Sequence, residues 1–263
     1  MTRNVLILTL LFLLSAELHA GIVILNGLTH SYRTQKGNVY RGKIELQNTG
    51  SRPQSVKLYL QDLTYQYDGT ILYLPPSSNQ GSNSHWIDLQ SGLLSLKERE
   101  RTEVFYEIRV PDSVSQGGSY WSTIIVEPVD HMEPNGSGGG VQITSVVRYA
   151  IQVITDFATE GLRPELVFKR IDVSRKGDQA FLNVALANSG KVYCRPRTSI
   201  ELFDARNAEK VSHLHGQELG LLPGTSKTYS IDAGKLPPGR YKAVLYASDR
   251  EHNVFSIQVE LEI

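Results

Sequence analysis

The residues of this chain that could do chemistry are few, and their spacing does not assemble a reactive site. Among the seven histidines, only His213 and His215 lie close enough to share one face of a strand. With a third ligand such as Glu218 they could hold a metal ion, although surface histidines in a loop are the commoner explanation. Cys194 is the only cysteine, and no neighbouring histidine could activate it as a nucleophile. We therefore expect no catalytic residues, no cofactor and no metal site.

The charge balance excludes further classes of function. The 263 residues contain 27 Lys and Arg against 27 Asp and Glu, so the formal net charge is zero. A dedicated nucleic-acid-binding protein needs a broad electrostatic attraction that a neutral chain does not supply. A single cysteine cannot form an intramolecular disulfide, so core packing alone must hold the fold together. We expect a protein partner and no nucleic acid.

The first 20 residues have the three-part pattern of a secretory signal peptide. Arg3 provides a basic start, an apolar run extends from Val5 to Leu14, and the small residue Ala20 precedes the expected cleavage point. A helix of about ten residues rises about 15 Å, whereas the apolar core of a bilayer is about 30 Å thick, which disfavours a membrane anchor. We expect a mature chain without membrane insertion in the periplasm, with secretion or envelope association as the second choice.

The rest of the chain shows the period-two alternation of apolar residues that is typical of half-buried strands. Clear examples are Val104 to Val110, Leu182 to Leu186 and Phe255 to Ile263. Turn sequences rich in Gly, Pro and Asn separate these segments at short intervals. Because many short strands of this kind build antiparallel sandwiches or barrels, we expect an all-β chain.

The order of these elements occurs twice. One strand ends in Asn48-Thr49-Gly50 in the first half, and the corresponding strand ends in Asn188-Ser189-Gly190 in the second. A later strand begins with a Gly turn followed by Tyr120, and its counterpart by Tyr241. A Tyr in this place resembles the tyrosine corner of immunoglobulin-like sandwiches, where the hydroxyl binds a preceding connection.

These repeats predict two tandem immunoglobulin-like β-sandwich domains after the cleaved signal peptide. The signal peptide comprises residues 1–20 and the first domain residues 21–157. A short polar linker, 158–165, contains Gly161 and Pro164, and the second domain comprises residues 166–263. Both domains have an ordinary size for sandwiches of this class.

The segment 141–154 stands out from the other strands. It is long, rich in β-branched residues and apolar at alternating positions, and it follows the stretch 134–140, which has no apolar side chain. In the interior of a sheet it would be only a core strand. At the edge of a sheet it would be a template for pairing with another chain. The sequence alone leaves both interpretations open.

An exported chain of two such domains, with a long alternating strand closing the first domain just before the linker, resembles the periplasmic pilus chaperones. In that family, this strand lends alternate apolar side chains to an incomplete pilus subunit. The resemblance implies a chaperone that caps surface-fibre subunits by β-strand addition and that has an outer-membrane usher as a further partner. The donated side chains would be Val141, Ile143, Val147, Tyr149, Ile151 and Val153.

The same family uses two basic residues, in the cleft between its domains, to hold the C-terminal carboxylate of the subunit. Arg33 lies near the first of these positions in this chain. Arg148 is the only basic residue of the closing strand, and alternation points it away from the donated face. The resemblance therefore implies a carboxylate anchor formed by Arg33 and Arg148.

The first domain is also similar to the first domain of the WxL-interacting surface proteins. The matching sequence segments are Trp86-Ile87-Asp88-Leu89, Val110-Pro111 and Gly118-Ser119-Tyr120. This similarity implies an alternative function, a secreted or envelope-associated adhesive or structural module that recognises cell-wall glycan or a protein. Exposed aromatic residues between Tyr65 and Trp86 could then stack on sugar rings. The same stretch could also be a hairpin and loop with ordinary core aromatics.

Overall fold

The computed structural model describes residues 21–90, 92–129, 147–251 and 253–263. Several expectations lie outside these residues: the signal peptide 1–20, the stretch 134–140, and the side chains of Val141 and Ile143. The described part of the chain is built from strands with one short 3-10 helix at Ser84–Trp86, so the all-β prediction is confirmed.

The first domain packs two sheets face to face. One sheet has the strand order β1-β3-β8-β6, and the other has the order β2-β10-β9-β4-β5 with β7 also paired to β4. The residues between them, including Ile44, Tyr106, Ile124 and Ile151, form a buried apolar core. The strands are β1 (Ile22–Ile24), β2 (Thr29–Thr34), β3 (Val39–Asn48), β4 (Gln54–Tyr65), β5 (Ile71–Leu74), β6 (Ile87–Leu89), β7 (Gly92–Leu96), β8 (Arg101–Arg109), β9 (Gly118–Val129) and β10 (Tyr149–Phe157).

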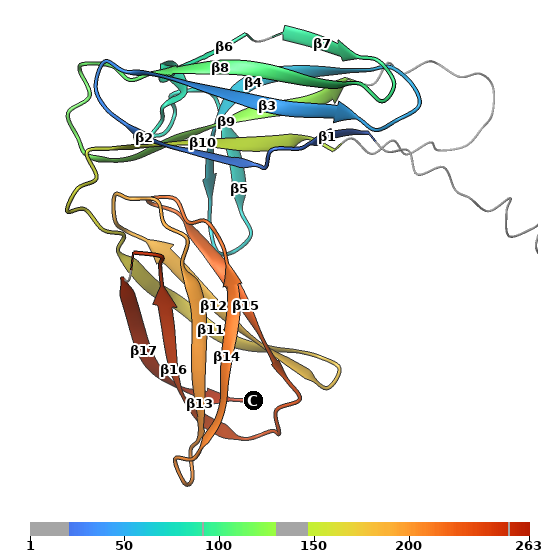
Figure 1. Cartoon of the computed structure of the whole chain (residues 1–263). Coiled ribbons are helices and arrows are strands. Elements are labelled where there is room, and N and C mark those ends of the chain that lie inside the picture. The colour runs from blue at the N-terminus through green and yellow to red at the C-terminus, as the bar shows by residue number, and fades with distance from the viewer. Residues whose placement is uncertain (1–20, 91, 130–146, 252) are drawn as a thin grey trace, which may run out of the picture.

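The second domain is a smaller sandwich with sheets β11-β12-β15 and β14-β13-β16-β17. It lies below the first domain in Figure 1, and the chain between Phe157 and Leu166 connects the two. Leu182, Leu202 and Tyr229 lie at the centre of its core. The strands are β11 (Leu166–Lys176), β12 (Gln179–Asn188), β13 (Arg197–Asp204), β14 (Lys210–Glu218), β15 (Ser226–Gly234), β16 (Arg240–Ser248) and β17 (Val254–Glu262).

The internal repeat is present in three dimensions. The Asn48 side chain donates to the carbonyl of Arg52 at 2.7 Å, and Asn188 donates to the carbonyl of Val192 at 2.8 Å, each closing the turn after its strand. Both tyrosine corners are confirmed. The Tyr120 hydroxyl donates to the carbonyl four residues earlier at 2.8 Å, and the Tyr241 hydroxyl does the same at 2.8 Å.

The hairpin formed by β4 and β5 extends from the first domain onto the second (Figure 1). The buried side chain of Tyr65 belongs to an apolar cluster that continues from Trp121 and Ile154 into the second core. At the tip, the Tyr67 N–H donates to the Ser226 hydroxyl at 3.0 Å. The two domains therefore share an apolar and hydrogen-bonded interface in addition to the linker.

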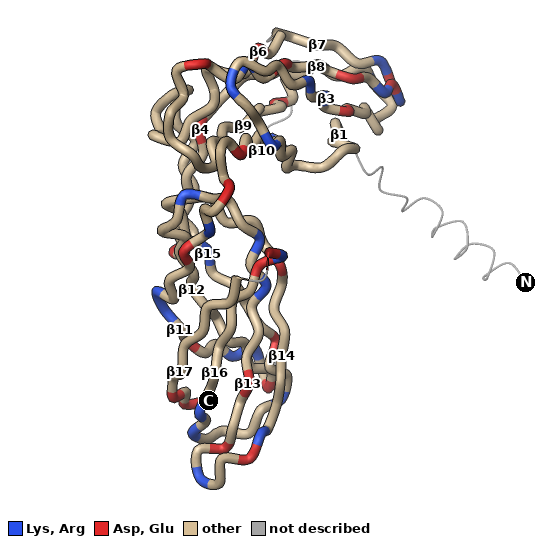
Figure 2. Tube along the Cα trace, turned by 60° about the vertical axis from the view of Figure 1, so that its left-hand side comes forward, with Lys and Arg blue, Asp and Glu red and all other residues tan. Residues whose placement is uncertain are grey.

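Charged residues of both signs are interspersed over the two domains (Figure 2). Ion pairs on the first domain join opposite charges on neighbouring strands, such as Arg41 with Glu107 at 3.0 Å, or within one strand, such as Lys43 with Glu45 at 2.9 Å. Acidic and basic side chains therefore neutralise one another locally, as the formal net charge of zero suggests. In the described part of the chain, no helix has the length and apolar character needed to cross a membrane.

Candidate functional site

The strand β10 is partly an interior strand and partly an edge strand. It pairs with β9 in antiparallel register from Tyr149 to Phe157. It pairs with β2 in parallel register only from Gln152 onward. Within the described residues, Tyr149 to Ile151 therefore have a neighbouring strand on one side and none on the other. The edge-strand interpretation therefore applies to residues 149–151, and the interior-strand interpretation applies to residues 152–157.

The backbone of Ala150 points to the open side. The Gln152 N–H donates to the carbonyl of Leu28 at 2.9 Å, so the polar groups of Gln152 face β2. Because backbone N–H and C=O groups alternate in direction along a strand, those of Ala150 face the same way. At Ala150, however, no described strand lies on that side. Unpaired groups of this kind are a template for another strand.

The open edge exists because the N-terminal chain changes sheets. β1 pairs with β3 in one sheet, whereas β2 pairs with β10 in the other. The crossover between them, residues 25–28, is held on β3 by Leu25 and Asn26 and meets β10 only at the Leu28 carbonyl. The Leu25 N–H donates to the Glu45 carbonyl at 2.9 Å, and the side-chain amide of Asn26 also binds β3.

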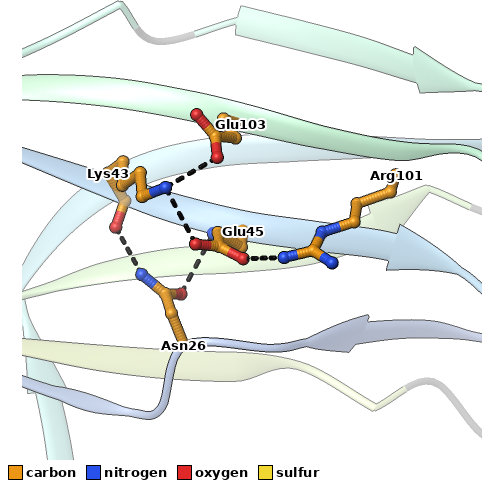
Figure 3. A network of polar contacts seen from close by, with 5 residues as sticks. All are labelled: Asn26, Lys43, Glu45, Arg101 and Glu103. Atoms are coloured by element: carbon orange, nitrogen blue, oxygen red, sulfur yellow. Dashed lines mark hydrogen bonds and ion pairs between the residues drawn. The ribbon is translucent and has the colours of Figure 1, made fainter.

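Charged side chains surround this attachment (Figure 3). Lys43 forms ion pairs with Glu45 at 2.9 Å and with Glu103 at 2.7 Å, and Arg101 pairs with Glu45. Hydrogen bonds from Lys43 and Arg101 hold the pKa of the Glu45 carboxyl below its ordinary value. Hydrogen bonds to Glu103 and Glu45 raise the pKa of Lys43. The ion pair between Lys43 and Glu45 beside Asn26 therefore stays charged at neutral pH.

Apolar side chains border the open edge. Leu25 and Leu28 on the crossover are 41% and 47% exposed, and Val147, just before β10, is 60% exposed. The Tyr149 side chain is half-buried against the first core. Exposed apolar groups beside an unpaired strand are a typical sign of a protein interaction site.

The six side chains expected to enter a partner divide into three groups. Val141 and Ile143 lie outside the described residues. Val147 and Tyr149 have exposed surface next to the open edge. Ile151 and Val153 are fully buried in the core of the first domain, so their side chains are not free to enter another chain.

The structure does not bring Arg33 and Arg148 together. Arg33 lies opposite Asp156 in the β2–β10 ladder. Arg148 precedes Asp156 by eight residues, which is roughly 26 Å along an extended chain. The Arg148 guanidinium instead lies 5.2 Å from the ring centre of Tyr73. The two guanidinium groups therefore do not lie together as a joint carboxylate anchor.

Arg33 has an acidic neighbour at the junction of the domains. Burial raises the pKa of Asp156, while a hydrogen bond from Ser119 and the charge of Arg33 act in the opposite direction. The Ser119 hydroxyl also accepts a hydrogen bond from the Tyr193 N–H of the second domain at 2.7 Å. Arg33 is thus an exposed cation beside the contact between the domains.

The other candidate groups show no reactive arrangement. His213 and His215 are exposed on β14 with ring centres 4.5 Å apart, but Arg195 and Arg250 bind the Glu218 carboxylate at 3.0 and 2.8 Å. Across the residues that the structure describes, no three His, Cys, Asp or Glu side chains are placed to hold a metal ion. Burial raises the pKa of Cys194 to about 12, so its thiol stays protonated.

The aromatic stretch between β4 and β6 is mostly buried or half-buried, and Tyr67 alone among Tyr65, Tyr67, Tyr73 and Trp86 is exposed. Tyr65 and Trp86 are buried, and they contribute to the interdomain cluster and the first core, respectively. The Tyr73 ring is half-buried and carries the Arg148 guanidinium. Core and interface packing therefore explain Tyr65 and Trp86, for which the expectation of exposure is wrong, whereas Tyr67 is exposed as that expectation requires.

Sequence reasoning missed the residues of the crossover. Leu25, Asn26 and Leu28 lie in a segment whose importance comes from a change of sheet, and apolar alternation does not reveal such a change. The available signal was the pair Asn26-Gly27, which is a typical turn sequence. Gly27 has a φ of +85°, a conformation that favours glycine.

No protein-family model matches the chain, and no curated protein matches its sequence. Several solved structures of pilus chaperones are similar in fold. A chain from the chaperone–tip adhesin complex of CFA/I fimbriae is 11% identical with a TM-score of 0.46, covering 92% of this chain and 99% of its own. The YadV chaperone is 12% identical with a TM-score of 0.45, covering 91% and 99%. The E. coli chaperone DraB is 12% identical with a TM-score of 0.42, covering 92% and 97%.

At these identities the likeness concerns the fold alone. The similar structures are mostly those of periplasmic pilus chaperones, the family that the two-domain plan resembles. Nothing found supports the second resemblance, to the WxL-interacting surface proteins.

Proposed function

We propose that this protein is a periplasmic chaperone that captures an incomplete surface-fibre subunit by β-strand addition at the open edge of β10. The observation that supports this most strongly is the backbone of Ala150, which has no partner strand on one side among the described residues and lies between exposed apolar residues. Strand addition derives its affinity from backbone hydrogen bonds and its specificity from alternate side chains. Both kinds of contact are available at this edge.

The division of β10 between core and edge suits a strand that must hold one domain and contact another. Ile151 and Val153 anchor the strand in the first core. Val147 and Tyr149, preceded by Val141 and Ile143, would present alternate apolar side chains to the subunit. The choice of a fibre subunit as partner, and of an usher as a further partner, rests on the family resemblance rather than on the geometry.

Arg33 is the group that we assign to the C-terminal carboxylate of the subunit. It is exposed beside the junction of the two domains, and the subunit chain would reach it by continuing past the open edge along β2, which covers β10 from Gln152 onward. Arg148 has no part in this contact, because it lies near Tyr73 at the other end of the strand. One guanidinium can still form two hydrogen bonds to a carboxylate.

Co-expression with candidate fibre subunits tests this function. The full chain should raise the amount of soluble subunit in the periplasm and co-purify with it. Replacing both Val147 and Tyr149 with Asp should reduce recovery of the subunit by about tenfold or more, because charges cannot enter an apolar groove without a large cost. The matched control is Val254→Asp, at an exposed apolar position of β17. Equal recovery with both variants would count against strand capture.

A further inference from the structure

The first domain contains a segment of its own that could close the open edge of β10. β2 pairs with β10 in parallel register, with Thr29 opposite Gln152. If this register continued toward the N-terminus, residues 26–28 would lie opposite 149–151 and would pair with the backbone of Ala150. The chain instead leaves β10 at Leu28 and crosses to β3, so a specific interaction must hold it there.

That interaction is made by the side chain of Asn26. Its Nδ2 donates to the Lys43 carbonyl at 2.7 Å, and its Oδ1 accepts from the Glu45 N–H at 3.0 Å (Figure 3). The amide thus continues the β1–β3 ladder by one step after the backbone has turned away. Among side chains, only Asn and Gln combine a donor and an acceptor in one planar amide. The positive φ of Gly27 lets the chain turn directly after this contact.

The two residues that Asn26 binds are themselves held in place. The side chains of Lys43 and Glu45 form ion pairs with each other, and with Glu103 and Arg101 on β8. Ion pairs at the surface each contribute little to stability. Their role here is to keep β3 and β8 in register beneath the crossover, so that the carbonyl and N–H that receive Asn26 stay in position.

We propose that Asn26 is a positioning residue that keeps the edge of β10 free for a partner strand, by holding the start of the crossover on β3. The proposal deepens the proposed strand capture and rests on it for its biological purpose. Leu25 and Leu28 then form the outer wall of the capture site. The captured strand must therefore carry apolar side chains toward this wall as well as toward Val147 and Tyr149.

Amide hydrogen exchange at Ala150 tests the positioning role directly. An unpaired edge amide exchanges quickly, and a paired one is protected. In the unmodified chain we expect fast exchange at Ala150. In Asn26→Ala the crossover is free to pair with β10, and exchange at Ala150 should slow by about tenfold or more. A lost structural hydrogen bond elsewhere would not produce this local gain in protection.

A conservative variant and a control separate the positioning role of Asn26 from general destabilisation. Asn26→Asp keeps the oxygen that accepts from Glu45 and loses the donor to Lys43, so it carries the same test if Asn26→Ala does not fold. Asn183→Ala also removes side-chain hydrogen bonds of an Asn on a strand, but in the second domain. It should leave exchange at Ala150 unchanged.

Subunit capture, measured in parallel, distinguishes the two proposals. Asn26→Ala should lower capture together with the gain in protection, and Leu28→Ser should lower capture without changing exchange at Ala150. If exchange responds as expected but the unmodified chain captures no fibre subunit, the positioning role of Asn26 is supported and the proposed function fails. If Ala150 is already protected in the unmodified chain, or if Asn26→Ala leaves its exchange fast in a folded protein, the positioning role of Asn26 is refuted.

Discussion

The hydroxyl of Tyr65 in the first domain accepts a hydrogen bond from the backbone N–H of Leu222 in the second domain, at 3.0 Å. The same hydroxyl donates to the Gly220 carbonyl at 3.3 Å, and the Lys227 ammonium lies 4.3 Å from the ring centre. Burial raises the pKa of Tyr65 to about 12, so the hydroxyl keeps its proton and both hydrogen bonds persist across the physiological range. The β4–β5 hairpin thereby ties the two domains together.

Replacing Tyr65 with Phe should weaken this tie. The variant leaves the buried N–H of Leu222 without its partner, and an unsatisfied buried group costs about 1–3 kcal/mol. Urea unfolding should therefore show a loss of stability of that size, and small-angle scattering should show a wider range of domain orientations. Tyr67→Phe is the matched control, because Tyr67 contacts the second domain through its backbone. Indistinguishable results for the two variants would contradict the role assigned to the Tyr65 hydroxyl.

A half-buried histidine should make the first domain sensitive to acid. The Nδ1 of His30 is 2.7 Å from the Tyr106 hydroxyl, and its Nε2 is buried without a hydrogen-bond partner in the described chain. Burial lowers the pKa of His30 from its ordinary value of 6.5, although the backbone of Asn26 and Gly27 partly offsets this effect. Below that value the unfolded chain binds a proton that the folded chain does not, so stability falls.

We therefore expect the free energy of unfolding to decrease as the pH is lowered from about 7.5 to 5.5. The decrease should become smaller in His30→Gln, which does not titrate, and should persist in His213→Gln, whose side chain is exposed. Denaturant unfolding at each pH gives the comparison. A pH dependence that is unaffected by His30→Gln would show that other groups cause it.

The lone thiol should be inert in the folded protein. Cys194 is buried, and burial together with the charge of Asp249 raises its pKa to about 12. Since the thiolate is the reactive form, a thiol reagent at pH 8 should not modify the native chain within minutes. In denaturing urea the same reagent should modify one thiol for each chain. Rapid modification of the native protein would contradict the burial of Cys194 in the second core.

The local features of the fold could be predicted from the sequence, because they depend on neighbouring residues. Period-two alternation marks β-strands, and the paired turns at Asn48 and Asn188 reveal two copies of one plan. The tyrosine corners at Tyr120 and Tyr241 follow from a Gly turn and the strand after it. In each case the hydrogen bonds join residues four positions apart.

The parts that could not be predicted depend on pairing between distant segments. Nothing near Asn26 in sequence indicates that its side chain binds Lys43 and Glu45 on another strand. The separation of Arg33 and Arg148 likewise follows from the register of β2 on β10, which alternation does not determine. Sequence patterns identified the closing strand, whereas strand register determined which of its residues are free.

Neighbouring residues of β10 should respond in opposite ways to proline, which removes a backbone donor. The N–H of Ala150 faces the open edge, so Ala150→Pro should leave the domain folded, as proline is tolerated on the free side of an edge strand. Subunit capture should nevertheless fall by about tenfold or more, because a carbonyl of the partner strand loses its donor and the strand meets the proline ring. The N–H of Ile151 faces β9, so Ile151→Pro should cost about 3 kcal/mol or more. Circular dichroism with thermal unfolding, combined with the capture assay, separates the two effects. Normal capture by a folded Ala150→Pro variant would exclude the edge of β10 as the site of strand addition.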